Sequence, residues 1–134
     1  MSMAIKRVYE PALESDGRRV LVDRLWPRGI SRENAQLDEW LKDAAPSPEL
    51  RVWFGHKAEN FERFSQLYRA ELDNDPVKQS AVRQLLNMGM DDRVTLVYGA
   101  KSETNNHAAV LRDYLLEKAM DLQIRHRSRD SREC

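Results

Sequence analysis

The spacing of apolar and polar positions along this chain separates strands from helices. Short runs rich in Ile, Val, Leu and Tyr predict three strands, at residues 4–9, 18–25 and 93–98. The run Val20-Leu21-Val22 has no alternation, so we expect both faces of the second strand to be covered. Pro27 cannot continue a central strand, and the chain is expected to leave the sheet there.

Helical spacing of apolar residues dominates between the second and third predicted strands and again after the third. The predicted helices cover residues 31–45, 47–55, 61–72, 75–89 and a last segment capped by Asn105 or Asn106. Ser31 is the expected N-cap of the first, and Ser47 with Pro48 is typical of the start of the second. Gly89 is the expected C-cap of the fourth.

This order of elements predicts a small three-layer α/β domain, Rossmann-like, with a mainly parallel sheet and a helical insertion between strands. Because helices join the second and third strands, these two are expected to be parallel. The domain is expected to occupy residues 1–120. The apolar rhythm fades from Asp121, so residues 121–134 are predicted to form a polar, disordered tail ending in a solvated Cys134 thiol.

Composition narrows the class of protein. The 134 residues fit one domain, and a charged fraction of 33% predicts a densely ionic surface. Lys and Arg total 22, as do Asp and Glu, and this neutral balance argues against a dedicated nucleic-acid-binding protein. A single cysteine excludes an internal disulfide framework. The sequence has no apolar run of membrane-spanning length and no signal core near its start, so a cytoplasmic protein without a membrane partner is expected.

Charged and aromatic residues follow the second predicted strand directly. Asp23, Arg24, Trp26 and Arg28 lie within six positions of one another, around Pro27. Arginine binds carboxylate and phosphate through the paired N–H groups of its planar guanidinium, so Arg24 and Arg28 together are candidates for binding one anion. The alternative is that Asp23 pairs with an arginine and Trp26 only packs.

A second candidate segment follows the third predicted strand. Its candidate ligand-binding residues are Tyr98, Lys101 and Asn106, and the loop runs into a helix start, where free N–H groups and the helix dipole favour an anion. His107, in the first turn, is a candidate acid or base if it is neutral, or else a structural histidine. The loop has neither a Walker sequence nor GxGxxG, so no cofactor is indicated. Because parallel strands end at one edge of a sheet, the two segments are expected to meet.

A third segment, Trp53-Phe54-Gly55-His56, leaves two interpretations open. The aromatic residues can fill the core, or His56 can face the same sheet edge as a second candidate acid or base. A metal site would need His56, His107, Asp23 or Glu103 to converge, and their spacing does not require it, so no metal ligand is predicted.

Several motifs resemble one known family. They are Lys6-Arg7-Val8-Tyr9, Leu21-Val22-Asp23-Arg24-Leu25-Trp26-Pro27-Arg28-Gly29, Trp40-Leu41-Lys42-Asp43, Pro46-Ser47-Pro48-Glu49-Leu50, Trp53-Phe54-Gly55-His56, Tyr68-Arg69-Ala70-Glu71-Leu72 and Val94-Thr95-Leu96-Val97-Tyr98. In these, over about Ile5 to Leu116, the chain resembles the YeaO-like proteins, a bacterial family classed as a domain of unknown function (DUF488). The resemblance implies a small cytoplasmic α/β domain with no settled activity.

Other branches of that wider family show where this chain departs from the pattern. They carry a Cys-Ala-Glu segment after a strand and Cys-His-Arg at the start of a helix, and the matching stretches here are Gly99-Ala100-Lys101 and Asn106-His107-Ala108. The histidine is kept, while both cysteines and the arginine are absent. The resemblance therefore points to the same two loops but argues against thiol chemistry in this chain.

The leading hypothesis is a binding site for a small anionic, phosphate-bearing ligand at the carboxyl ends of the strands. Arg24 and Arg28 would hold the anion and Asp23 would orient an arginine; any catalysis would use His107 or His56. One alternative is a nucleic-acid-binding or regulatory protein, since the helix-rich middle and the arginine-rich tail allow it. Another is a protein-interaction module that docks through Trp40 or Trp53. The oligomeric state is left open.

Overall fold

The fold is built on a four-stranded parallel sheet. A computed structural model describes the backbone of residues 1–133 and the side chains of residues 1–125, so the expected Cys134 thiol lies outside the described residues. The strands are β1 (Met3–Arg7), β2 (Arg18–Leu21), β3 (Glu39–Trp40) and β4 (Val94–Tyr98). Their order is β1-β4-β2-β3, and every pairing is parallel. The predicted α/β class, the three predicted strands and the parallel pairing of β2 with β4 are confirmed.

Within residues 1–133, five helices flank the sheet. They are α1 (Arg32–Ala35), α2 (Pro48–Phe54), α3 (Phe61–Asn74), α4 (Pro76–Asp91) and α5 (His107–Glu133), with short 3-10 turns at Glu14–Asp16, Lys42–Ala44 and Ala58–Asn60. Side-chain caps explain three of the starts. Ser47 accepts the Leu50 N–H, Asp75 accepts the Val77 N–H, and Asn106 accepts the Ala109 N–H.

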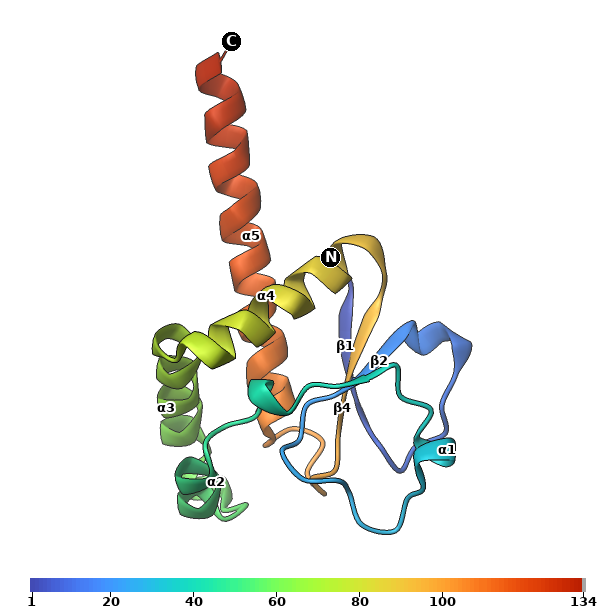
Figure 1. The fold of residues 1–134 in the computed structure, drawn as a ribbon. Coiled ribbons are helices and arrows are strands. Elements are labelled where there is room, and N and C mark those ends of the chain that lie inside the picture. The colour runs from blue at the N-terminus through green and yellow to red at the C-terminus, as the bar shows by residue number, and fades with distance from the viewer. Residues whose placement is uncertain (134) are drawn as a thin grey trace.

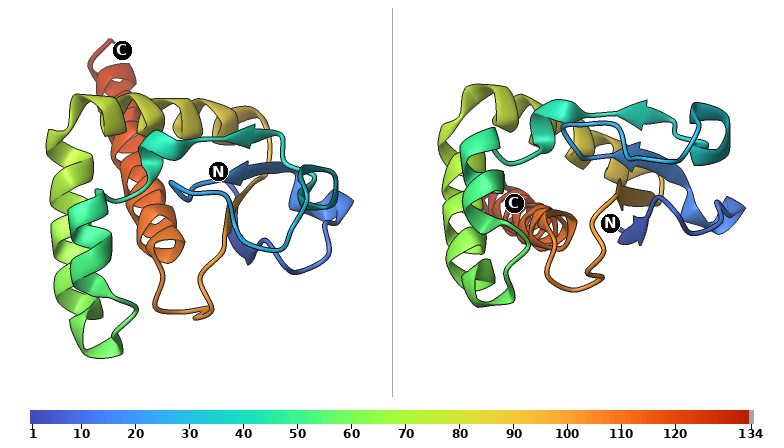
Figure 2. Two further views of the ribbon diagram at one scale, coloured as in Figure 1. Left: turned by 60° about the horizontal axis from the view of Figure 1, so that its bottom comes forward. Right: turned by 90° about the horizontal axis from the view of Figure 1, so that it is seen from below.

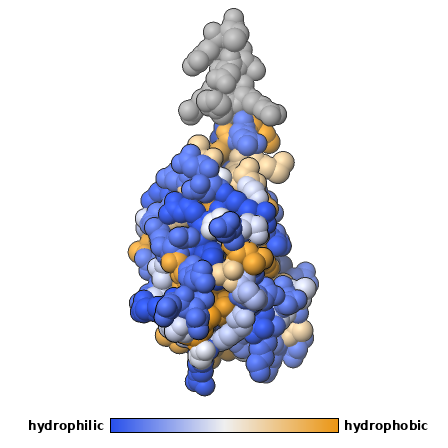
Figure 3. All heavy atoms as spheres, turned by 90° about the vertical axis from the view of Figure 1, so that its right-hand side faces the viewer, coloured by the Kyte–Doolittle hydropathy of each residue, from blue (hydrophilic) through white to orange (hydrophobic). Residues whose placement is uncertain are grey.

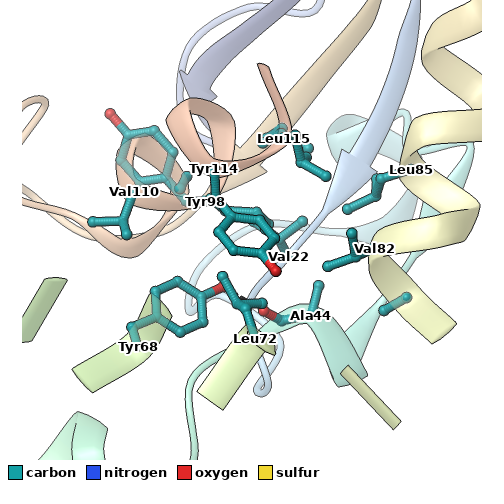
Figure 4. Packing of buried hydrophobic residues seen from close by; sticks show 14 of the residues in the cluster. Val22, Ala44, Tyr68, Leu72, Val82, Leu85, Tyr98, Val110, Tyr114 and Leu115 are labelled. Atoms are coloured by element: carbon teal, nitrogen blue, oxygen red, sulfur yellow. Dashed lines mark hydrogen bonds between the residues drawn. The ribbon is translucent and has the colours of Figure 1, made fainter. Parts of the chain in front are cut away.

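The two faces of the sheet are covered unequally (Figures 1 and 2). One face, with Val20, Val22 and Leu96, packs against α2, α3, α4 and α5 and forms the main core. Figure 4 shows Val22 and Tyr98 from the sheet side of that core among side chains of the helices. Within residues 1–125, the other face is covered by α1 and the loops beside it, which form a smaller cluster around Leu21 and Val97.

The predicted helix over residues 31–45 is wrong. Only one turn forms, α1, and it ends at Gln36 with a left-handed φ of 47°. The chain then becomes extended as β3, where the Leu41 N–H donates to the Leu21 carbonyl and the indole of Trp40 donates to the Asp23 carbonyl at 2.7 Å. Leu37 and Trp40 thus pack on the smaller cluster from an extended segment. Sheet hydrogen bonds outweigh the helical spacing of these apolar residues.

Two helix ends differ from prediction. Gly89 is not a C-cap, because α4 continues to Asp91 and is capped by Asp92. Gly89 is instead buried inside the helix, where an added Cβ would lie 3.0 Å from the Cε of Met1. Helix α5 passes residue 120 without interruption and its backbone is helical to Glu133, which fits the absence of Gly and Pro from this stretch. The separation of residues 121–134 as a tail stays a prediction.

A buried ionic cluster stabilises the amino edge of the sheet, the edge at which the strands begin. The Asp16 carboxylate accepts hydrogen bonds from Arg19 at 2.7 Å and from Lys6 at 3.1 Å, and the Leu13 N–H adds a third at 3.0 Å. The Asp16 and Arg19 side chains are 9% and 4% exposed. Arg19 also donates to the Ala35 carbonyl at 2.8 Å. This cluster therefore ties β1, β2 and α1 together.

The surface is mostly hydrophilic, as the high fraction of charged residues predicts. Figure 3 looks onto the side that carries α1, and hydrophilic residues cover most of it, with apolar side chains in small separate patches. Over residues 1–133, none of the helices combines the length and the apolar character that crossing a membrane requires.

Candidate functional site

A cavity of about 340 Å³ lies at the carboxyl edge of the sheet, the edge at which the strands end. The loops that follow β2 and β4 meet there, as Figures 1 and 2 show at the end of the sheet away from the amino edge. Six of the residues that the sequence nominates line this single cavity: Asp23, Arg24, Trp26, Arg28, Asn106 and His107. His56, which the sequence leaves between core and site, lines it as well.

Asp23 joins the two loops. One of its carboxylate oxygens, Oδ2, accepts the Gly99 N–H at 2.9 Å, immediately after β4. The other, Oδ1, lies 3.1 Å from Nε2 of His107. The expectation that Asp23 orients an arginine is wrong, because within residues 1–125 the basic side-chain nitrogen near its carboxylate is Nε2 of His107. Close packing explains the glycine, since a Cβ on Gly99 would lie 3.0 Å from Oδ2 of Asp23.

His107 is held firmly at the start of α5. Its Nε2 lies 3.1 Å from the Val22 carbonyl oxygen, and a carbonyl only accepts, so Nε2 carries a hydrogen. The side chain is 15% exposed, and its ring lies edge-on to Tyr68 with centroids 6.4 Å apart. His107 is therefore both a structural link between α5 and β2 and a lining residue of the cavity.

Basic side chains line the cavity. Arg28, Arg51 and His56 are exposed, and Arg24 is half-buried. Within residues 1–125, none of the three arginines forms an ion pair. Asp23 is the one carboxylate among the lining residues, and its Oδ2 already accepts the Gly99 N–H. The charge facing the cavity is thus predominantly positive.

Two polar atoms of this site have no hydrogen-bond partner among the described residues, although they are shielded from solvent. They are Oδ1 of Asp23, which His107 approaches without hydrogen-bond geometry, and Nε of Arg24. Unpaired buried polar groups are costly, on the order of 1–3 kcal/mol each, and they concentrate at functional sites. A small side-chain shift that pairs Arg24 with a bound acceptor would remove part of this cost.

The cavity floor is apolar. Ala45, Phe54 and Phe64 are 2%, 5% and 1% exposed, and all three line the cavity. The Phe54 and Phe64 rings stack with centroids 4.3 Å apart. Phe54 therefore packs in the core, as one interpretation of its segment predicts, and also forms part of the site.

Helix α2 brings His56 to the cavity. Its C-cap, Gly55, and the next residue, His56, both adopt left-handed backbone conformations, with φ of 56° and 58°. The second is unusual for a residue with a side chain. Trp53, on the same helix, is 47% exposed and lines a different groove between α2 and α3. The segment is thus divided between core, cavity and surface.

Two nominated residues do not line the cavity. Tyr98 ends β4 with its side chain in the main core, 2% exposed, and Lys101 is exposed on the loop. Asn106 does line it, but its side chain caps α5 and also donates to the Ser102 carbonyl at 3.0 Å. Its polar atoms are thus already used by the protein. Within the described residues, no third potential metal ligand joins Asp23 and His107.

Sequence reasoning missed Arg51, Phe64 and the Ala45-Pro46 pair, all of which line the cavity. They lie in the helical insertion, far in sequence from both strand ends. Nothing in their local pattern distinguishes them, because helix packing alone brings them to the sheet edge. The one available signal was the short distance in sequence between Arg51, inside a predicted helix, and His56 just after its end.

Tyr68 and Tyr98, which lie near the site, keep their protons. Burial raises the pKa of Tyr68 well above its ordinary value, and the charges of Glu71 and Asp23 raise it further. Burial also raises the pKa of Tyr98, with the charges of Glu103 and Glu10 adding to the shift. Tyr68 donates its hydroxyl to the Ala44 carbonyl (Figure 4). Neither side chain therefore contributes negative charge beside the cavity.

Comparisons with known proteins place the chain in a family. It matches the family described as "Inactive DUF488-N3 subclade" over residues 2–134. It is 44% identical over 115 residues to the uncharacterized protein YeaO of Escherichia coli strain K12, covering 86% of this chain and 97% of that protein. It is 40% identical over 111 residues to the uncharacterized protein Rv3073c of Mycobacterium tuberculosis strain H37Rv, covering 83% of this chain and 91% of that protein. No solved structure shows a significant match. The chain belongs to the DUF488 family, within the subclade described as inactive DUF488-N3.

Proposed function

We propose that this protein binds a small phosphate-bearing anion in the cavity at the carboxyl edge of the sheet. The observation that carries the proposal is the convergence of Arg24, Arg28 and Arg51 on one cavity without ion-pair partners among the described residues. Guanidinium groups bind phosphate through paired, charge-assisted hydrogen bonds. The position, outside the carboxyl ends of parallel strands, is where open α/β sheets bind ligands.

The site is better suited to binding than to turnover. Among its lining residues there is no cysteine, serine or threonine that could serve as a nucleophile. The hydrogen on Nε2 of His107 is directed at the Val22 carbonyl, so this nitrogen is not free to accept a proton from a ligand. The description of the matched subclade as inactive supports the same conclusion. The proposed role is therefore recognition of the ligand without chemistry.

Replacing Arg28 with Ala tests the proposal. We expect the affinity for inorganic phosphate to fall roughly tenfold to a hundredfold, because one charge-assisted contact of about 1.5–3 kcal/mol is lost. The Arg28 side chain is exposed, so the melting temperature should stay close to that of the parent protein. Isothermal titration calorimetry with phosphate at low salt measures the first quantity, and thermal denaturation the second.

Arg83→Ala is the matched control. Arg83 is an exposed arginine on α4, outside the lining of the cavity. Its replacement removes the same charge from the protein and should leave phosphate binding unchanged. Equal losses of phosphate affinity in both variants would mean that binding depends only on the net charge of the protein. If the Arg28 variant did not fold, the Arg28 side chain would be structural. Either result would reject the proposed site.

A further inference from the structure

The buried and the exposed residues of the cavity lining differ in polarity, and this difference indicates which organic group the ligand carries. The buried lining residues include three apolar ones, Ala45, Phe54 and Phe64, together with Asn106, whose amide is already hydrogen-bonded within the protein. The lining arginines Arg28 and Arg51 are exposed. An anion held by these cations would therefore sit toward the opening, with an apolar space left beneath it.

The volume also exceeds that of a lone anion. At roughly 30 Å³ for each water, 340 Å³ corresponds to about eleven waters. A phosphate ion would fill only part of this space and would leave the phenylalanine floor against water. Burying this apolar surface is most favourable in free energy when the group that covers it is itself apolar.

From these observations we infer that the ligand is an aromatic phosphomonoester: a single flat ring that enters first, with a phosphate that remains at the cationic opening. The inference rests on the proposed function and deepens it. The ring would contact the stacked pair of Phe54 and Phe64, since aromatic rings favour offset or edge contacts with one another. Arg24, Arg28 and Arg51 would contact the phosphate. An aliphatic or strongly hydroxylated phosphate fits the same opening but not the floor.

Comparison of three probes tests the inference. Phenyl phosphate, glycerol phosphate and inorganic phosphate share the same anionic group, and they differ in the organic group attached to it: a ring, a hydroxylated chain or none. Calorimetric titration of the intact protein is expected to show phenyl phosphate binding at least about tenfold more tightly than either of the others, because apolar area is buried only with the ring.

Two variants locate the ring. Ala45→Leu and Ala100→Leu each add apolar volume to the cavity lining, from two different loops. In each, the ratio of the phenyl phosphate affinity to the inorganic phosphate affinity should fall toward one. Either variant suffices if the other does not fold. Val52→Leu adds a methylene group to an exposed position of α2 outside the cavity and should leave the ratio unchanged.

The outcomes separate the two proposals. If the three probes bind the parent protein equally, the aromatic inference is wrong and the anion site stands. If no probe binds, the anion site itself is wrong, and the inference fails with it. If phenyl phosphate keeps its advantage in the folded alanine-to-leucine variants, the ring binds elsewhere and the inference is rejected.

Discussion

Replacing Asp16 with Asn is expected to lower the free energy of unfolding by about 3 kcal/mol. The Asp16 carboxylate lies between Arg19 and Lys6 and accepts hydrogen bonds from both. The amide of asparagine has no charge and points a donor at one of these cations. Removing one partner of a buried ion pair typically costs about 3–5 kcal/mol, because the remaining charge is left uncompensated. Urea denaturation monitored by circular dichroism measures the change.

The same residue predicts an acid-dependent loss of stability. Burial raises the pKa of the Asp16 carboxyl, but hydrogen bonds from Leu13, Lys6 and Arg19 outweigh it, and the pKa in the folded protein lies below its ordinary value. A depressed folded pKa means that the stabilisation is complete above the unfolded pKa of about 3.9. It is lost as the pH falls through the folded pKa. Asp16→Asn should therefore flatten the fall in unfolding free energy below about pH 4.

Asp43→Asn is the control for both measurements. Asp43 is exposed in the 3-10 turn Lys42–Ala44, and no ion pair of it is found within residues 1–125. Surface substitutions of this kind usually change stability by no more than about 0.5 kcal/mol. If Asp16→Asn proved as mild as the control, or kept the parent's acid sensitivity, the ionic cluster would not be a main source of stability.

Gly17→Ala is expected to destabilise the fold by about 3 kcal/mol or more. Gly17 has a φ of 67°, and a Cβ there would lie 2.2 Å from the Arg93 carbonyl oxygen. That oxygen accepts the Arg18 N–H at 2.8 Å, at the first pairing of β2 with β4. The clash is with backbone, so the central strands must separate or the loop must refold. Urea denaturation should show the loss directly.

Gly29→Ala is the control that separates the steric clash at position 17 from the free-energy cost of placing alanine in a left-handed backbone conformation. Gly29 has a φ of 76°, but nothing lies within 4 Å of the added Cβ. Its alanine variant should lose only about 1–2 kcal/mol, which is the cost of the conformation alone. Equal losses at the two glycines would show that the close approach to Arg93 is not what requires glycine at position 17.

The sequence predicts well those features that depend on local chemistry. Val20-Leu21-Val22 reads as a buried strand because three successive apolar side chains need cover on both faces, and Val22 and Leu21 do pack in the two different clusters. Ser47 with Pro48 marks a helix start because both residues suit the first turn irrespective of the surroundings. Asp23 and His107 meet because parallel strands end at one edge.

Features that depend on long-range packing cannot be predicted from the sequence. Leu37 and Trp40 are spaced as on a helix, yet pairing with β2 makes their segment extended. Gln36 adopts a left-handed conformation without the glycine that would have signalled it. Arg51 reaches the cavity only because α2 docks beside the sheet edge. The sequence thus predicts the two loops of the proposed site. The third arginine, Arg51, and the apolar floor can be placed there only from the fold.

The two edges of the sheet are expected to have different roles, stabilisation at the amino edge and binding at the carboxyl edge, and nuclear magnetic resonance can test that division directly. Amide spectra of the parent protein would be recorded while inorganic phosphate is added at low salt. We expect concentration-dependent shifts for Arg28, Gly99 and His107 around the cavity, and none for Gly17 and Arg93 at the amino edge. Shifts scattered over the surface, or their absence at the carboxyl edge, would contradict the central claim that phosphate is bound there.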